Sequence, residues 1–230
     1  MKGKIVLTAL GAFCLGLCLA LTGFLRTATD GDLYYRTQIS CHVEPGVTPE
    51  QMKELDLILA DCLAGDKTAM DRAELFNERE KTHMADVAKL FDLARLVKLI
   101  SAILAAALLL TGLLPAGNRR KRLKWGAIVG TILLFVPVLI VVIWAVIDFA
   151  SAFRAMHLLL FDNELWLMNP ETDLMIRMLP EEFFTSFART LALRTALFAL
   201  IMPVGLWALS LPQTGALPDN DETQTTESAD

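Results

Sequence analysis

The segment WGAIVGTILLFVPVLIVVIWAVI, residues Trp125 to Ile147, contains no charged side chain. An α-helix rises about 1.5 Å per residue and the hydrocarbon core of a bilayer is about 30 Å thick, so roughly 20 apolar residues span a membrane. This segment reaches that length and predicts a transmembrane helix. Asp148 ends the apolar run, so we expect the chain to leave the membrane there.

Three further apolar blocks flank this segment. Ile5 to Leu25 is long enough to span a bilayer, and its basic start resembles a signal peptide that is retained as a signal anchor. Leu99 to Leu114 and Thr195 to Leu211 are shorter. They reach the required length only if helix continues outward past Lys98 and Arg194, whose long side chains can extend to the lipid headgroups. The sequence therefore predicts four transmembrane helices.

The composition agrees with a membrane protein. Hydrophobic residues make up 54% of the 230 residues, and the mean hydropathy is +0.48. These values argue against a soluble fold. The net charge is −5, and the charged residues are segregated into a basic loop, an acidic region and an acidic tail. The sequence therefore offers no exposed basic face for nucleic acid.

Basic residues in short loops predict the orientation. The segment NRRKRLK, Asn118 to Lys124, has five basic residues and no acid, and the N-terminus carries Lys2 and Lys4. Short loops rich in Lys and Arg stay in the cytoplasm. Both termini are therefore expected on the cytoplasmic side of the membrane, and the two regions on the other side hold all three histidines.

We predict a mainly α, polytopic membrane protein with a small extracytoplasmic α(+β) cap. Its segments are transmembrane helix 1 (1–25), an extracytoplasmic region (26–95), transmembrane helix 2 (96–115), a basic cytoplasmic loop (116–124), transmembrane helix 3 (125–148), an extracytoplasmic motif loop (149–190), transmembrane helix 4 (191–211) and a disordered cytoplasmic tail (212–230).

The first outer region contains predicted local structure. The segment Leu33 to Val43, LYYRTQISCHV, has the composition of a strand. Thr48 followed by Pro49 and, at the third helical position, Gln51 is typical of a capped helix start; this helix is expected to end near Gly65.

The outer regions also contain two cysteines and three further predicted helix starts. The sequence leaves open whether Cys41 and Cys62 form a disulfide or stay free. Thr82 is a predicted N-cap of one long helix that runs through the second span and places His83 near its outer end. In the second outer region, we expect helices to start at Asn169-Pro170-Glu171-Thr172 and at Leu179-Pro180-Glu181-Glu182.

His83 and His157 each lie where an outer region meets a predicted span. A lone histidine at such a place more often caps or hydrogen-bonds its neighbours than forms a site. Two histidines at one depth favour a site, because neighbouring charged residues are able to orient them: Glu78, Arg79, Glu80, Asp86 and Asp148. The sequence has no Gly-x-Ser-x-Gly elbow, HExxH pair or Walker loop, and its Cys and His residues lack the paired spacing of zinc ligands. We therefore expect neither a metal nor a cofactor.

Two segments of this predicted four-span membrane protein resemble the bacterial lipoprotein intramolecular transacylases. They are FNEREKTHMADV (Phe76 to Val87) and FRAMHLLLFDNELWLMNPETDLMIRMLPEEFF (Phe153 to Phe184). The second is more specific because its His, Asn, Trp, Pro, Asp and Leu-Pro-Glu elements occur in order. Leu160 departs from the pattern, where the family is expected to have phenylalanine, and this bears on packing or acyl contact more than on chemistry.

The resemblance implies an enzyme of the plasma membrane of Gram-positive bacteria, with its active site at the extracytoplasmic face. It would move the sn-2 acyl chain of a lipoprotein's diacylglyceryl-cysteine onto the cysteine's own α-amino group, giving the lyso form. His83 and His157 would be the active-site histidines, acting in acid/base roles that the sequence does not assign. The predicted supporting or substrate-binding residues are Glu78, Arg79, Asp86, Asp148, Phe153, Asn163, Trp166, Asp173 and Pro180.

The implied partners are diacylglyceryl-modified bacterial lipoproteins and membrane lipid, with no nucleic acid or nucleotide. Two alternatives remain at this stage. One is a non-catalytic membrane protein whose outer loops bind a peptide or protein. The other is an acyltransferase or hydrolase that acts on free phospholipid.

Overall fold

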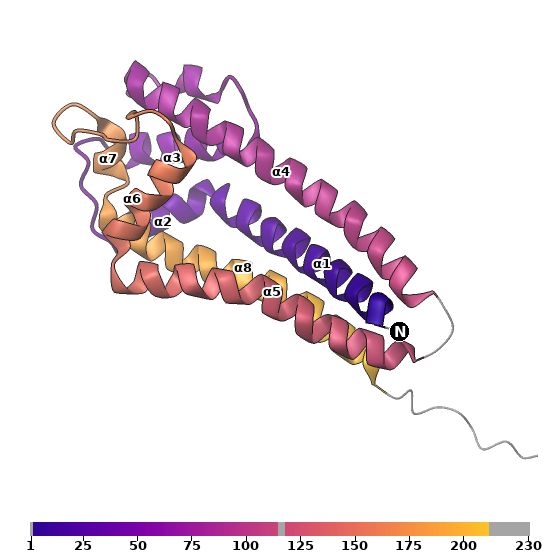
Figure 1. Cartoon of the computed structure of the whole chain (residues 1–230). Helices are drawn as coiled ribbons and strands as arrows, with labels where there is room; N and C mark the ends of the chain where they lie inside the picture. The colour runs from indigo at the N-terminus through magenta and orange to yellow at the C-terminus, as the bar shows by residue number, and fades with distance from the viewer. Residues whose placement is uncertain (1, 115–117, 212–230) are drawn as a thin grey trace, which may run out of the picture.

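The computed structural model describes residues 2–114 and 118–211. Within these residues, four helices are long and apolar enough to cross a bilayer, as predicted (Figure 1). They are α1 (Lys2–Ala28), α4 (Glu78–Leu113), α5 (Arg119–Ile147) and α8 (Glu181–Ser210). The chain is therefore a multi-pass membrane protein. The predicted tail, residues 212–230, lies outside the described part of the chain.

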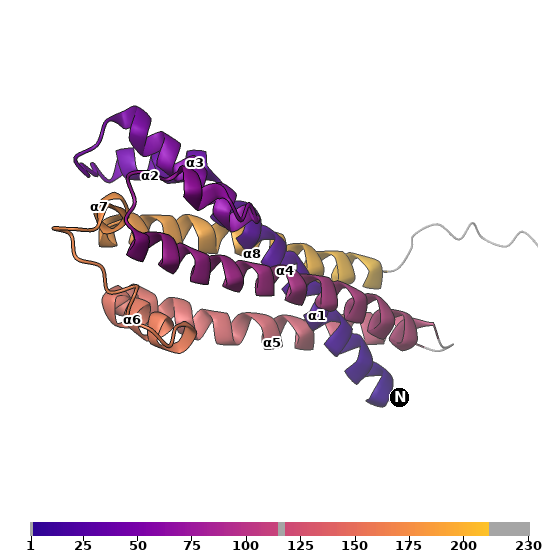
Figure 2. The ribbon, with the colours of Figure 1, turned by 90° about the horizontal axis from the view of Figure 1, so that it is seen from above.

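The shorter helices gather at one end of the bundle, opposite the N-terminus (Figures 1 and 2). We call this end the cap. Its helices are α2 (Gly31–Ser40), α3 (Pro49–Ala64), the 3₁₀ turn η1 (Ala69–Arg72), α6 (Phe149–Leu160) and α7 (Leu174–Met178).

Helix α1 packs against the other three long helices. Small residues permit the close approach that drives helix association in membranes. A Cβ atom added at Gly112 of α4 or Gly126 of α5 would lie 2.6 Å from the Thr8 side chain of α1. A Cβ added at Gly130 would lie 2.7 Å from the Cβ atom of Ala12. The backbones of α4 and α5 therefore reach α1 only because these positions are glycine.

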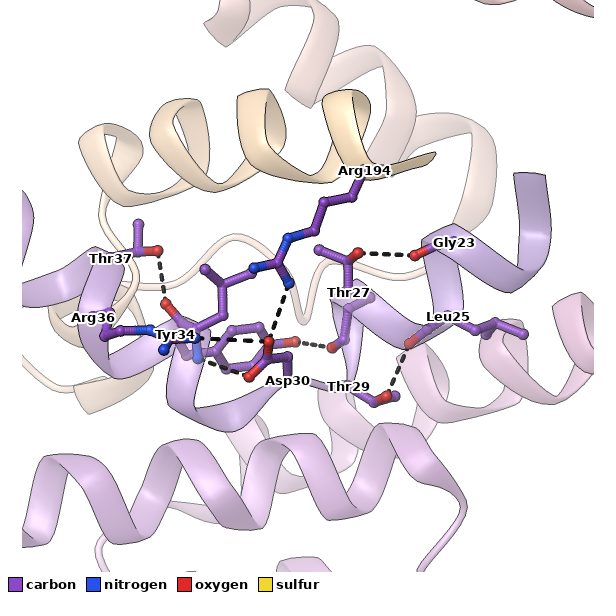
Figure 3. Close-up of polar contacts among 11 residues, drawn as sticks. Gly23, Leu25, Thr27, Thr29, Asp30, Tyr34, Arg36, Thr37 and Arg194 are labelled. Carbon is purple, nitrogen blue, oxygen red and sulfur yellow. Dashed lines mark hydrogen bonds and ion pairs between the residues drawn. The ribbon is translucent and has the colours of Figure 1, made fainter. Parts of the chain in front are cut away.

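A polar junction links the C-terminal end of α1 to the cap and to α8 (Figure 3). The Asp30 carboxylate caps α2 by accepting from the Leu33 amide at 3.0 Å, and it pairs with Arg194 of α8 at 3.2 Å. The Tyr34 hydroxyl donates to the Ala28 carbonyl. Arg194, which we expected to extend to the lipid headgroups, instead joins α8 to the start of the cap.

The cap has its own hydrophobic core. Leu59 of α3, Met178 of α7 and Phe183 of α8 are almost completely buried there. Tyr34 of α2 packs edge-on against Phe183 and Phe187, with ring centroids 6.0 and 4.9 Å away. Residues 31–40, 49–64 and 174–187 therefore fold as one unit on top of the bundle.

The predicted strand at 33–43 is wrong, because residues 31–40 form helix α2. Its buried residues Leu33, Tyr34 and Thr37 recur at helical rather than alternating spacing. Asp30 is the N-cap of α2, and aspartate at this position is a helix-start signal. The β-like composition of the following residues led to the prediction of a strand instead. Within the described residues, the cap consists of helices and the turns between them and contains no strand, so the predicted β component is absent.

Two of the four predicted helix starts are confirmed. Thr48 caps α3 with a complete capping box, and α3 ends at Gly65, which adopts φ +114°. Helix α8 begins at Glu181, immediately after Pro180. The predicted long helix also exists, as α4.

The other two starts are wrong. Helix α4 begins at Glu78, more than a turn before Thr82, because Asn77 and Glu80 form a capping box. Helix α7 begins at Leu174, since the Asn169 side chain accepts from the Glu171 amide and makes a turn. Cys41 and Cys62, whose pairing the sequence left open, are free in the structure.

Candidate active site

One row of aromatic rings on helix α6 faces the N-terminal end of α4. Residues four apart lie on the same face of a helix, which places Phe149, Phe153 and His157 in a row. The ring centroids are 5.7 Å apart for Phe149 and Phe153, and 4.2 Å apart for Phe153 and His157. The imidazole of His157 is buried, with 7% of the residue exposed.

One hydrogen bond determines the tautomer of His157. Its Nδ1 lies 2.8 Å from the carbonyl oxygen of Phe153. A carbonyl oxygen can only accept, so Nδ1 carries the proton in this bond. In the neutral ring, Nε2 is then left with a free lone pair that can accept a proton.

His83 faces His157 from the second turn of α4. It is also 7% exposed, and the two ring centroids lie 6.3 Å apart at an interplanar angle of 27°. Its Nδ1 is buried and has no hydrogen-bond partner among the described residues. The structure thus places the two predicted histidines beside each other although they lie far apart in the sequence.

Aromatic rings enclose this pair of histidines. Trp166 stacks on His157 at 4.9 Å between centroids. Phe161 lies 5.2 Å from His83 and 5.7 Å from His157. The predicted site residues did not include Phe161, although its position four residues after His157 placed it on the same helical face.

Both imidazoles lie at the cap end of the bundle, outside the apolar part of the spanning helices. Helix α4 has 36 residues and is about 54 Å long, much longer than the bilayer core of about 30 Å. Charged residues occur along α4 up to Lys98, so the apolar part that follows is the span and His83 belongs to the projecting turns. His157 lies on α6, which follows the end of α5.

Burial keeps both imidazoles neutral. It lowers the pKa of His83 to about 4, with a smaller contribution from the charge of His157, while Asp86 acts in the opposite direction. Burial also lowers the pKa of His157, opposed by the bond to the Phe153 carbonyl. At neutral pH the site therefore holds two uncharged rings that can accept protons or donate hydrogen bonds.

Predicted supporting residues hold the loop that carries Trp166. Arg79 donates to the carbonyl oxygens of Glu164 and Leu167, the second at 2.9 Å. The Asn163 amide donates to the Asp86 carboxylate at 3.0 Å. The Trp166 indole donates to the Asn163 carbonyl at 3.0 Å. Helix α4 thereby fixes the ring that covers His157.

Asp173 holds a second loop against the start of α4. Its carboxylate accepts from the Asn77 side chain and from the Asn169 amide, both at 2.8 Å. The fully buried carboxylate of Glu80 accepts from the amides of Asn77 and Met175, which ties the start of α4 to α7. Sequence reasoning expected Glu80 to orient a histidine; the Asn-x-x-Glu spacing of a capping box was the signal for its observed role.

Three predicted supporting residues lie at helix ends. Glu78 is exposed beside Lys81 at 3.8 Å, Asp148 caps α6 through the Ser151 amide at 3.0 Å, and Pro180 precedes α8. No hydrogen bond or ion pair joins them to either histidine in the described part of the chain. Within the same residues, no group of three His, Cys, Asp or Glu side chains is placed to hold a metal ion.

Comparison with known proteins gives the family. Residues 9–184, more than half of the chain, match the family described as "Lipoprotein intramolecular transacylase Lit". No curated protein matches the chain significantly.

Solved structures agree with this match in fold. The fold is similar to that of the membrane integral lipoprotein intramolecular transacylase Lit from Bacillus cereus, with a TM-score of 0.69 at 21% identity over 90% of this chain and 94% of that one. Two variants of that enzyme, in which one histidine is replaced by arginine or by alanine, give TM-scores of 0.70 and 0.69 at the same identity. They cover 91% of this chain, and 91% and 92% of theirs. The chain is therefore a member of the lipoprotein intramolecular transacylase family and a membrane-integral transacylase.

Proposed function

We propose that this enzyme uses His83 and His157 to move the sn-2 acyl chain of a lipoprotein's diacylglyceryl-cysteine onto the α-amino group of the same cysteine. The observation that carries the proposal is the pair of buried, neutral imidazoles, 6.3 Å apart between centroids, contributed by α4 and α6. The substrate is a diacylglyceryl-modified lipoprotein held in the outer leaflet.

The reaction requires only proton transfer and charge stabilisation. The amine nitrogen attacks the ester carbonyl, a C–N bond forms, the C–O bond to the sn-2 oxygen breaks, and one proton passes from nitrogen to that oxygen. Donor and acceptor belong to one residue, so proximity can contribute up to about 7–11 kcal/mol to lowering the barrier. No electron is transferred and no protein nucleophile is needed.

The surroundings of the two rings support different roles. His157 acts as the base, because its Nε2 has a free lone pair and the Phe153 carbonyl stabilises the imidazolium that forms. It then returns the proton to the leaving glyceryl oxygen. His83, whose pKa is lowered to about 4, stays neutral and donates a hydrogen bond to the oxyanion of the tetrahedral intermediate.

The cap is the extracytoplasmic end of the molecule in this proposal. It lies opposite the N-terminus and the basic segment at the start of α5 (Figure 1). Short basic segments remain in the cytoplasm, so the histidines face the side on which mature lipoproteins are anchored.

The test is tandem mass spectrometry of lipoprotein N-termini from a bacterium whose own lipoproteins are diacylated with a free amine. Cells express the wild type, His83→Asn, His157→Asn or His42→Asn at equal membrane levels. His42 is an exposed cap residue with φ +54°, a conformation that Asn tolerates, and it is a matched control.

We expect the wild type and His42→Asn to place one acyl chain on nitrogen. His83→Asn and His157→Asn should each lower the yield by at least roughly 100-fold, as loss of a general acid/base or oxyanion group does. Full activity of either variant would remove that histidine from the mechanism. An unchanged lipopeptide with well-expressed wild type would refute the transfer itself.

A further inference from the structure

We infer that a small apolar cavity between α6, α7 and α8 holds part of the acyl chain that is transferred, and that Ala150 limits how much of a long chain the site accepts. This inference rests on the proposed function and deepens it. It names the group that determines chain preference rather than the groups that perform the chemistry.

The cavity has a volume of about 190 Å³. An apolar cavity of about 150 Å³ in another protein holds benzene, so this one has room for roughly six to eight carbon atoms of a chain. Its lining is aromatic and aliphatic except for one carboxylate: Phe149, Ala150, Phe153, Ile176, Glu181 and Phe184. A methylene chain therefore suits it better than a headgroup or a peptide.

The cavity adjoins the histidine site at one residue. Phe153 lines the cavity, and its ring lies 4.2 Å from that of His157 and 4.9 Å from that of Phe184, between centroids. An ester carbonyl at His157 would therefore place the next carbons of its chain against Phe153. The chain whose carbonyl reacts is the sn-2 chain, so that chain is the occupant.

The cavity also adjoins the end of α5, one of the helices that can span a membrane. Phe149 and Ala150 begin α6 directly after α5, whose last residues Val146 and Ile147 are 80% and 78% exposed. Such exposed apolar side chains at the end of a span belong in the hydrocarbon of the outer leaflet. A chain that starts at His157 can cross Phe153, pass Ala150 and continue into the membrane.

Ala150 is the position at which the cavity can be narrowed. It lies seven residues from His157, about 10 Å along the helix axis. A hexanoyl chain is shorter than that distance, whereas a hexadecanoyl chain passes Ala150. Ala150→Leu should therefore affect long chains and spare short ones. Ser151→Leu is the matched control, because Ser151 is the next residue, is exposed and does not line the cavity.

The experiment uses the purified full-length protein and synthetic diacylglyceryl lipopeptides. One series carries hexanoyl, decanoyl or hexadecanoyl at sn-2 with hexadecanoyl at sn-1; the other varies sn-1 instead. The quantity compared is the ratio of kcat/KM for variant and wild type at each chain length, which cancels differences in how the substrates partition into the micelle.

We expect Ala150→Leu to lower kcat/KM roughly tenfold for sn-2 hexadecanoyl, the effect of displacing one or two buried methylenes, with little change for sn-2 hexanoyl. Ser151→Leu should resemble the wild type throughout. An equal loss at every length, a loss that follows the sn-1 chain, or no loss would overturn the inference. If the wild type transfers no chain to nitrogen, the proposed function fails instead.

Discussion

His83 and His157 have the same exposure but different hydrogen bonding. His157 is held by the Phe153 carbonyl, whereas Nδ1 of His83 has no partner in the described part of the chain. Burial lowers the pKa of both, which favours neutral rings. This asymmetry predicts how the activity responds to pH.

The pH profile of kcat/KM should follow the substrate amine. Its unperturbed pKa is about 8, and it must lose its proton before it attacks, so activity should rise with pH up to that value. In the proposed mechanism the deprotonated histidines are the active forms, so their contribution is lost only as pH falls through their lowered pKa values, about 4 for His83. Initial rates should show no inflection near the ordinary histidine value of about 6.5. An inflection there would contradict the burial of the pair.

A second buried polar pair lies inside the cap. The Gln38 amide donates to Asp56 at 3.0 Å and to the Met178 carbonyl at 3.1 Å. Gln38 Oε1 and Asp56 Oδ2 are buried without a hydrogen-bond partner. Burial raises the pKa of Asp56 to about 8, although the Gln38 bond acts in the opposite direction. The carboxyl group is therefore protonated in the folded protein at neutral pH.

The raised pKa predicts that the cap loses stability as pH rises. The folded protein binds the Asp56 proton more tightly than the unfolded chain, so this contribution is complete below the unfolded pKa, 3.8, and is lost as pH rises through about 8. Asp56→Asn should remove this dependence and raise the unfolding free energy near pH 8 by about 1–3 kcal/mol, because the new amide can donate to Gln38.

Thermal unfolding in detergent across this pH range measures the effect of Asp56→Asn. Glu54→Gln, an exposed change on the same helix, should leave the pH dependence of the wild type intact. A lower melting temperature for Asp56→Asn at every pH would show that the carboxylate itself stabilises the cap.

At the scale of the element, the interface between α1 and α5 depends on glycine. In Gly130→Ala the new Cβ would lie 2.7 Å from the Ala12 Cβ and 2.9 Å from the Phe13 amide nitrogen, which belongs to the backbone and cannot rotate away. We expect this overpacking to lower the unfolding free energy by about 1–3 kcal/mol.

Gly205 of α8 is the control for this change. A Cβ there would meet no heavy atom within 4 Å. Gly205→Ala should be neutral or stabilising by up to about 1 kcal/mol, the difference in helix propensity. Thermal unfolding in detergent compares the two variants. Equal melting temperatures would show that α1 and α5 do not pack this closely.

At the scale of the whole molecule, the two ends of the bundle should be exposed to opposite sides of the membrane. In a variant without its four natural cysteines, Thr82→Cys at the cap and Arg120→Cys in the basic segment report on each end. We expect a membrane-impermeant maleimide to label Thr82→Cys in intact cells and Arg120→Cys only after permeabilisation. The reverse pattern would place the histidines in the cytoplasm and exclude mature lipoproteins as substrates.

The sequence alone determined those parts of the fold that depend on local pattern. The apolar blocks predicted four long helices, since length and hydropathy suffice to define a span. The Thr48 capping box predicted α3 to within a residue. Asn77 and Asp30 are also N-cap residue types, so the same kind of local signal marked the starts of α4 and α2. The prediction instead favoured the later Thr82 as a cap and the β-like composition of residues 33–43, so α4 was predicted too short and α2 was predicted as a strand.

Only the tertiary structure decided how the site is assembled. The sequence predicted that His83 and His157 lie at similar depth, but their 6.3 Å separation depends on how α6 folds back against α4. The hydrogen bonds of Arg79, Asp86 and Asp173 hold this arrangement. Each of them joins residues at least 77 positions apart in the sequence. Local propensity acts over a few residues, whereas the burial of the histidines and the apolar cavity arise from contacts between helices, which no single stretch of sequence contains.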